Sequence, residues 1–316
     1  MTAIKSLFIF LFLPLTLSLF GQRDYRRAEF SFTTENDVYL MNRDDEYYSN
    51  GFLFHYRYVP NKPDSSLNNK EIIDIELTHK FYTPNDLLFD QISELDRPYA
   101  GLLSVGISKS KFKSPQSRFK YGLVLGTTGK ASGAEVLQKW YHNAVGFKQP
   151  RGWQFQIKTA LVLNATAEYN RQFTLVPKSM DFISSSSTSL GTGHTNIAQN
   201  FDFRMGILNA LNKSPFVNAM IGENSQDLEK LGYVVFGYGV SYVLHDITVS
   251  GSLFNEDSPH IGRQMPWVST FRAGWATSNE KITFEIMFHW LSKDVQTASN
   301  DSYISFSFDF RLKNKN

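Results

Sequence analysis

The chain has 316 residues, enough for one large domain or two small ones, and it is rich in aromatic residues, with 27 Phe and 15 Tyr. It contains no cysteine, which excludes a disulfide framework and thiolate chemistry. Its net charge of +2 argues against a nucleic-acid-binding protein, because such proteins need an excess of Lys and Arg to neutralise phosphates.

The first 21 residues have the features of a secretory signal peptide. Lys5 supplies a positive charge, an apolar run covers residues 7–20, and Gly21 is a small residue at the expected cleavage site. The alternative is a membrane anchor, but the apolar run is shorter than the ~20 residues that a spanning helix needs. We therefore predict residues 1–21 as a signal peptide and residues 22–316 as a single domain, since no repeat or linker divides them.

After the leader, the dominant pattern is an alternation of apolar and polar residues. One such segment has Ile282, Phe284, Ile286, Phe288 and Trp290 on one parity, and Thr283, Glu285, Met287 and His289 on the other. Successive side chains of a strand face opposite ways, so the segment has one apolar and one polar face. Segments of about ten residues match the ~9–11 residues of tilted membrane strands, whereas soluble strands average ~5–6.

Charged residues also occur in the middle of the polar faces, which suits a barrel with lipid outside and a polar lumen inside. They are Asp74, Glu76, Glu168, Arg204, Arg272 and Glu285. We predict an all-β fold, a transmembrane antiparallel β-barrel of twelve strands, because a lipid-facing sheet must close on itself and single bacterial chains use an even strand count.

The predicted strands, in chain order, cover residues 28–37, 49–60, 70–82, 99–110, 117–128, 153–172, 177–189, 197–208, 232–244, 267–277, 280–291 and 302–312. We predict a short helix over residues 133–146, in the connection between strands five and six. Residues 246–254 are read as a possible extension of a hairpin beyond the membrane. The connection 209–230 is long for the periplasmic end, where turns are normally short, and the sequence assigns no function to it.

If strand one runs outward, three connections meet at the cell-surface end, and we number them in chain order: strand one to two is the first, strand three to four the second and strand five to six the third. Asn36, Asp37 and Ser49 belong to the first, Asp96 and Arg97 to the second, and the helix to the third. By parity, Asp37 and Ser49 point into the lumen, while Asn36 faces lipid unless a bulge intervenes.

Glu135, Gln138 and His142 share one face of the helix, because they are spaced by three and four residues. We expect this polar face to point into the lumen and the aromatic face to lie against the barrel wall. Each polar cluster alone has an ordinary explanation as a turn, a cap or a surface ion pair. Their convergence at one rim favours a functional site.

These residues resemble the outer-membrane lipid A deacylase family of the LpxR type. The resemblance rests on Asn36-Asp37, Tyr48-x-x-Gly51, Asp96-Arg97, Gln138-x-x-x-His142-x-x-x-Gly146 and Pro150-x-x-Trp153-x-x-Gln156. It implies a calcium-dependent hydrolase of the 3′-O-linked acyl(oxyacyl) ester of lipid A, acting as a monomer in the outer membrane of a Gram-negative bacterium. The chain departs from the family at Lys148, where some members carry a glutamate.

The family's site roles carry over as expectations. His142, Asn36, Asp37 and Ser49 are the implied catalytic residues; Asn36 and Asp37 the implied Ca²⁺ ligands; Arg97, Asp96, Gln138 and Lys148 the implied substrate-binding residues. Histidine titrates near pH ~6.5 and can act as a base, and oxygen ligands suit calcium. Either a water activated by His142 or Ser49 itself can be the nucleophile. The alternatives are another outer-membrane lipid esterase, such as a phospholipase A, and a passive porin.

Overall fold

The computed structural model describes residues 26–41, 46–60, 70–222, 231–254 and 257–313. The predicted signal peptide lies outside these residues. Within them, no helix has the length and apolar character needed to cross a membrane.

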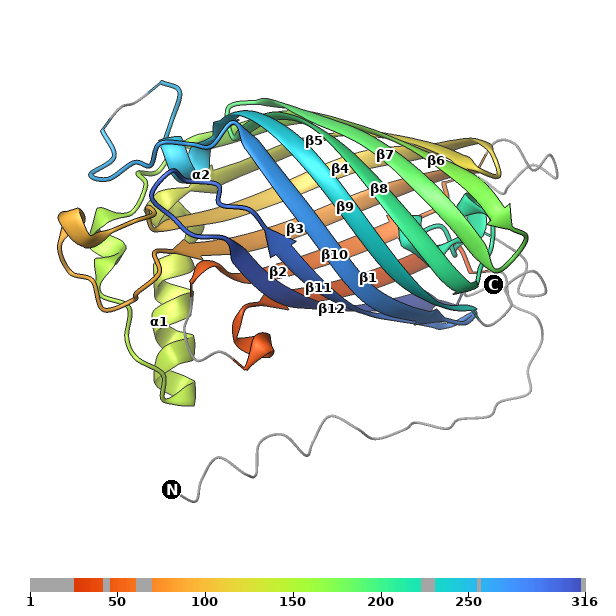
Figure 1. The fold of residues 1–316 in the computed structure, drawn as a ribbon, viewed down its shortest axis with the longest axis horizontal. Coiled ribbons are helices and arrows are strands. Elements are labelled where there is room, and N and C mark those ends of the chain that lie inside the picture. Colours follow the sequence, from red (N-terminus) through yellow and green to blue (C-terminus); the bar gives the residue numbers. More distant parts are fainter. Residues whose placement is uncertain (1–25, 42–45, 61–69, 223–230, 255–256, 314–316) are drawn as a thin grey trace, which may run out of the picture.

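Twelve antiparallel strands of the described residues form one closed barrel, in which each strand pairs with its sequence neighbours and β1 pairs with β12 (Figure 1). The strands are β1 Ala28–Asn36, β2 Tyr47–Tyr58, β3 Lys70–Thr83, β4 Ala100–Ser114, β5 Ser117–Thr128, β6 Leu161–Val176, β7 Met180–Gly191, β8 His194–Ile207, β9 Leu231–Asp246, β10 Trp267–Ser278, β11 Ile282–Leu291 and β12 Asp301–Leu312. The helices are α1 Ala134–Val145 and α2 Ile247–Ser250, and the 3-10 turns are η1 Val38–Leu40, η2 Ile92–Glu94, η3 Gly129–Ser132, η4 Gly152–Phe155, η5 Leu211–Lys213 and η6 Pro215–Val217. The predicted fold class, closure and strand number are therefore confirmed.

Apart from strand ends that are shifted by up to four residues, two predicted segments differ from the structure. The sixth strand was expected from residue 153 but begins at Leu161, because Trp153 is buried under α1 and its segment forms the turn η4. Residues 246–254 do not extend a hairpin: Asp246 accepts a hydrogen bond from the Thr248 backbone nitrogen and caps the short helix α2.

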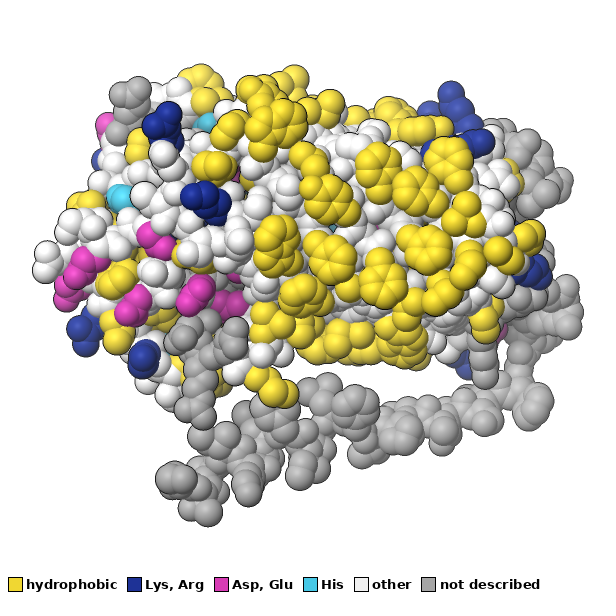
Figure 2. Space-filling view, viewed as in Figure 1, with side chains coloured by type: hydrophobic (Ala, Val, Ile, Leu, Met, Phe, Trp, Pro, Cys, Tyr) yellow, Lys and Arg dark blue, Asp and Glu magenta, His cyan; other side chains and the backbone are white. Residues whose placement is uncertain are grey.

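The apolar parity of the strands forms a hydrophobic band on the outside of the barrel. Figure 2 shows this band over the strands, with most charged side chains gathered towards the two ends. Ile107, Leu123 and Leu163 are more than half exposed, as expected of side chains that face lipid rather than a protein core.

The polar parity faces the lumen, where buried charges are paired. Arg204 makes two hydrogen bonds to the Asp181 carboxylate, at 2.9 and 2.6 Å. Arg272 makes two to Asp202, both of 2.6 Å. A buried charge without a partner is strongly destabilising, so these pairs explain how charges are tolerated at mid-strand.

The long connection after β8 folds back into the barrel. It enters at the end where β1 starts and β12 ends. We call residues 208–222 the plug segment. Its apolar side chains pack against Val59, which follows β2, and against inward-facing residues of β3, β4 and β7. The resulting core consists of Val59, Ile72, Phe112, Ile183, Leu211, Val217, Ala219 and Ile221. Lys70 Nζ donates to the backbone oxygens of Asn212 and Ala219, at 2.7 and 2.6 Å. The plug segment thus fills this end of the lumen.

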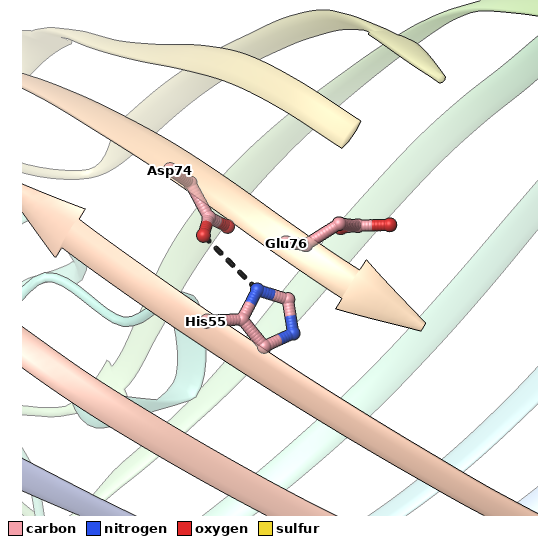
Figure 3. Close-up of side chains that lie close together, drawn as sticks. All are labelled: His55, Asp74 and Glu76. Atoms are coloured by element: carbon pink, nitrogen blue, oxygen red, sulfur yellow. Dashed lines mark hydrogen bonds and ion pairs between the residues drawn. The ribbon is translucent and has the colours of Figure 1, made fainter. Parts of the chain in front are cut away.

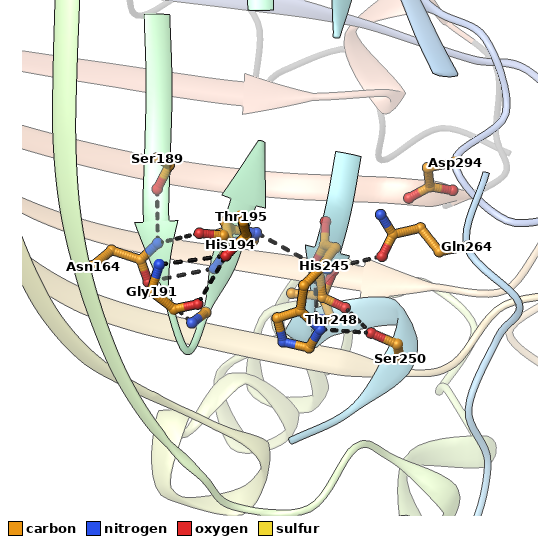
Figure 4. Close-up of polar contacts among 12 residues, drawn as sticks. Asn164, Ser189, Gly191, His194, Thr195, His245, Thr248, Ser250, Gln264 and Asp294 are labelled. Atoms are coloured by element: carbon orange, nitrogen blue, oxygen red, sulfur yellow. Dashed lines mark hydrogen bonds and ion pairs between the residues drawn. The ribbon is translucent and has the colours of Figure 1, made fainter. Parts of the chain in front are cut away.

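At the opposite end, α2 and the β7–β8 turn are held together by polar contacts (Figure 4). Asn164 Nδ2 donates to Ser189 Oγ at 2.7 Å, and Asn164 Oδ1 accepts from the Gly193 nitrogen at 3.0 Å. His245 Nδ1 and Ser250 Oγ are 3.1 Å apart. These contacts hold the β7–β8 turn on β6 and hold α2 on the end of β9.

Candidate active site

Helix α1 lies outside the barrel at the end opposite the plug segment (Figure 1). It starts after Gly133 and ends at Gly146, both of which have left-handed backbone angles that favour glycine. The helix contacts β3 and β4. Its approach requires a glycine in β4, because a Cβ at Gly101 would come within 2.3 Å of the Ala134 side chain.

A separate hydrophobic core fills the space between α1 and the outer surface of the barrel wall. It consists of Phe81, Leu87, Leu95, Tyr99, Ala134 and Trp153, with Phe52, Phe89, Leu137 and Phe155 packed against it. Phe52 and Phe81 come from the lipid-facing parity of β2 and β3, so this core covers the outside of the wall.

The orientation of α1 is the reverse of the prediction. The polar face was expected in the lumen, but Gln138 and His142 are buried against the outer surface of the wall, with 6% and 2% exposure. Val136 and Trp140 are 74% and 64% exposed instead of packing on the barrel. An amphipathic helix beside lipid can expose its apolar residues, which explains why a pattern read for a water-soluble setting gave the wrong face.

Two side-chain hydrogen bonds tie α1 to the turn η4. Trp153 Nε1 donates to Gln138 Oε1 at 2.7 Å, and Gln156 Nε2 donates to Glu135 Oε2 at 3.1 Å. Trp153 is fully buried and its ring centroid lies 5.0 Å from that of Tyr99. Three residues of the sequence motif therefore help to hold the helix on the barrel: Gln138, Trp153 and Gln156.

The imidazole of His142 is oriented by the chain that follows the helix. Its Nδ1 lies 2.6 Å from the backbone oxygen of Lys148. A carbonyl oxygen can only accept, so Nδ1 carries the hydrogen and Nε2 is the nitrogen that can take up a proton. Lys148 thus reaches the histidine through its backbone, while its side chain is exposed.

His142 lines a small cavity of about 60 Å³ between α1 and the barrel wall. The lining residues are Asn36, Asn50, Phe52, Phe81, Leu137, Gln138, Trp140, Tyr141 and His142. Asn36 reaches the cavity because it is on the lipid-facing parity of β1, which pairs with both neighbours without a bulge up to this residue. The first and third connections from the sequence analysis therefore meet here, outside the barrel rather than in its lumen.

The parity argument does not hold for Asp37 and Ser49. Asp37 has left the strand and caps the turn η1, accepting from the nitrogens of Val38 and Glu46 at 2.7 and 2.6 Å. Ser49 is the extra residue of a β-bulge between Tyr48 and Asn50, so alternation is interrupted there. It is buried, and its hydroxyl lies 3.5 Å from the backbone oxygen of Phe81.

Asp96 and Arg97 belong to the same rim but do not line this cavity. Asp96 accepts from the Tyr47 hydroxyl at 2.8 Å. Arg97 is fully buried, pairs with Asp294 at 2.9 Å and stacks over the Tyr82 ring. Burial alone would lower the pKa of Arg97, but the hydrogen bond and charge of Asp294, together with the charges of Asp246 and Tyr82, raise it above its ordinary value.

The sequence analysis assigned no role to Asn50, which lines the cavity with His142. Asn50 is the direct cross-strand neighbour of Asn36. The alternation of β2 could have shown that Asn50 faces outwards, because it precedes the inward-facing Gly51 by one residue and shares the outward parity of Phe52.

A group of potential metal ligands lies elsewhere, in the lumen. His55, Asp74 and Glu76 have ligand atoms within 4.8 Å of one another (Figure 3). His55 Nδ1 is 3.0 Å from Asp74 Oδ1, and Asp74 Oδ2 is 3.3 Å from Lys120 Nζ and 3.5 Å from Arg57 Nε. This group could hold a metal ion, although the side chains of Arg57 and Lys120 already interact with the Asp74 carboxylate. It is on the opposite side of the wall from His142.

Comparisons with known proteins agree with this architecture. A family model described as outer membrane protein LpxR matches residues 7–312. The structure of LpxR from Salmonella typhimurium superposes with a TM-score of 0.74 at 16% identity, covering 90% of this chain and all of that one. The β domain of the Bordetella autotransporter BrkA gives a TM-score of 0.45 at 10% identity, covering 91% of this chain and all of that one. A comparison with curated protein sequences yields no match.

Because the family model covers nearly the whole chain and the fold agrees, this protein belongs to the LpxR family of outer-membrane proteins, the lipid A 3′-O-deacylases.

Proposed function

We propose that this protein hydrolyses the 3′-O-linked acyl or acyloxyacyl ester of lipid A in the outer leaflet, with His142 as general base and calcium as cofactor. The observation that carries the proposal is the bond between His142 Nδ1 and the Lys148 carbonyl beside a cavity shared with Asn36. This bond selects the tautomer in which Nε2 is the basic nitrogen. A base held in this way removes a proton from the nucleophile in the ester-hydrolysis step.

Water is the nucleophile that the geometry favours. Ser49 does not line the cavity of His142, and its hydroxyl lies next to the backbone of Phe81. A covalent mechanism would need the serine oxygen within hydrogen-bond reach of the imidazole. A water in the cavity would meet Nε2 without any rearrangement of β2.

The residues at the first connection fit calcium by their donor chemistry. Asn36 offers an amide oxygen and Asp37 a carboxylate, the hard oxygen ligands that calcium prefers, and the two are adjacent at the end of β1. Calcium bound by these residues would polarise the ester carbonyl and stabilise the charge that develops on its oxygen. The lumenal group of His55, Asp74 and Glu76 is a weaker fit, because it includes an imidazole and lies beside Arg57 and Lys120.

The position of the cavity suits a substrate that stays in the membrane. Its lining side chains Phe52 and Phe81 belong to the lipid-facing parity, and Trp140 at its border is largely exposed. Tryptophan is favoured at membrane–water interfaces. The exposed side chain of Lys148 is suited to the lipid A phosphates. We propose that the protein acts as a monomer, since the closed barrel leaves no strand edge to pair.

Mass spectrometry of lipid A after incubation with purified protein tests the proposal. We expect loss of one acyl or acyloxyacyl mass with calcium present, no loss with a chelator, and a fall of about 10²–10⁴-fold for His142→Ala. His260→Ala, in a loop away from the cavity, is the matched control and should retain activity. An unchanged lipid A spectrum from folded protein with calcium would refute the deacylase assignment for that substrate.

The same experiment separates the alternatives. Release of fatty acid from phospholipids but not from lipid A would identify a phospholipase A. The porin alternative is disfavoured by the plug segment, whose residues Leu211, Ala219 and Ile221 are completely buried inside the barrel. We expect no stable conductance in planar bilayers.

A further inference from the structure

Asn50 occupies a position in the cavity that the sequence did not single out. It is the cross-strand partner of Asn36 in the β1–β2 pair and lines the same cavity as His142. Side chains of directly opposite residues on one face lie about 4.5–5.5 Å apart at their Cβ atoms. Two amide side chains are therefore presented together on the outer surface of the wall, beside the catalytic histidine.

The β-bulge at Ser49 lets Tyr48 face the lumen while Asn50, in step with Phe52, faces the outer surface. Tyr48 pairs with Tyr82 and faces the lumen, where its hydroxyl donates to Glu35. With regular alternation Tyr48 would share the parity of Asn50 and also face outwards. The extra residue shifts the register, so that Asn50 pairs with Phe81 and Tyr48 with Tyr82. Bulges commonly re-aim a side chain next to an active site.

The amide oxygen of Asn50 is buried and accepts no hydrogen bond from any residue that the structure describes. Leaving such an acceptor unsatisfied is destabilising, so native proteins rarely keep one without a functional reason. Several residues that line the same cavity carry donors, but none of them donates to this oxygen. The oxygen is therefore available to a ligand of the cavity.

We propose that Asn50 Oδ1 is a ligand of the calcium ion, in addition to Asn36 and Asp37. Calcium takes 6–8 oxygen ligands, more than two side chains supply, and amide oxygens are among those it accepts. A neutral amide adds a ligand without adding charge, and it fits a cavity whose remaining walls are mainly apolar. This inference rests on the calcium dependence of the proposed function and extends its ligand set.

Calcium titration of the full-length protein in detergent micelles by isothermal calorimetry tests the inference without relying on catalysis. Asn50→Leu should weaken calcium binding by at least about tenfold, whereas Asn50→Asp, which keeps an oxygen at this position, should retain it. Asn200→Leu makes the same chemical change on β8, away from the cavity, and should bind calcium like the unmodified protein. The melting temperature without calcium reports folding of each variant.

A purely structural Asn50 would behave differently. Replacing an unsatisfied buried amide by Leu would leave the calcium affinity unchanged, and this result in a folded variant would overturn the inference. If the unmodified protein cleaves lipid A but binds no calcium, Asn50 is not a ligand, although the deacylase assignment stands. If it binds calcium with loss of affinity in Asn50→Leu but cleaves no lipid A, the ligand assignment stands and the substrate assignment fails.

Discussion

Replacing Trp153 with Phe removes the donor that holds Gln138 and tests how α1 is docked. The bond is 2.7 Å long and both residues are buried, so the acceptor on Gln138 loses a partner that water cannot easily replace. An unsatisfied buried acceptor costs about 1–3 kcal/mol, and the smaller ring leaves a void beside Tyr99 that adds to this. We expect α1 docking to weaken by about 2–4 kcal/mol in total.

The effect should be local, because the twelve strands keep all of their pairings. Hydrogen–deuterium exchange should therefore accelerate in residues 134–146 and remain slow in the strands. The turnover of lipid A should fall, since Gln138 and His142 line the cavity. The double variant Trp153→Phe with Gln138→Leu should lose less than the sum of the single variants, because both polar partners are gone. Trp267→Phe, which changes a largely exposed tryptophan of β10, is the control. Unchanged exchange in α1 for Trp153→Phe would refute the reasoning.

Two further predictions concern residues that the sequence assigned to substrate binding. Lys148→Ala should raise KM for lipid A about two- to fivefold with little change in kcat, because an exposed charge is worth ~0.2–1 kcal/mol and the backbone contact to His142 is kept. A large fall in kcat at constant KM would contradict this role. Arg97→Met should lower stability by about 1.5–3 kcal/mol through loss of its charged hydrogen bonds to Asp294, with the lower figure favoured because Asp294 is partly exposed. Thermal unfolding measures this loss, and Asp294→Asn should reproduce part of it; equal melting temperatures for Arg97→Met and the unmodified protein would show that the pair is not stabilising.

Alternation alone was sufficient to predict the barrel. A membrane strand must be apolar on one parity and fully hydrogen-bonded, so its length, faces and closure follow from local residue order. Strands such as β5 and β11 therefore lie within two residues of their predicted bounds. The start of β6 could not be read in this way, because Trp153 is held by the helix that packs over it rather than by a neighbouring strand.

The plug segment illustrates the same limit. Its residues are neither alternating nor helical in pattern. They become buried only because Val59 and inward-facing side chains of β3, β4 and β7 surround them. Nothing local to residues 208–222 indicates that the lumen is where they pack.

For the site, the sequence by itself determined which chemical groups meet at one rim: the carboxylate and amide of the first connection and the histidine of the third. Only the tertiary structure decided on which side of the wall they meet. The bulge at Ser49 lets Tyr48 face the lumen while Asn50 faces outwards, and the core under α1 turns His142 towards the outer surface. The bulge arises where β2 pairs with β3, and the core under α1 joins residues of β3 and η4, so neither effect follows from the periodicity of one segment.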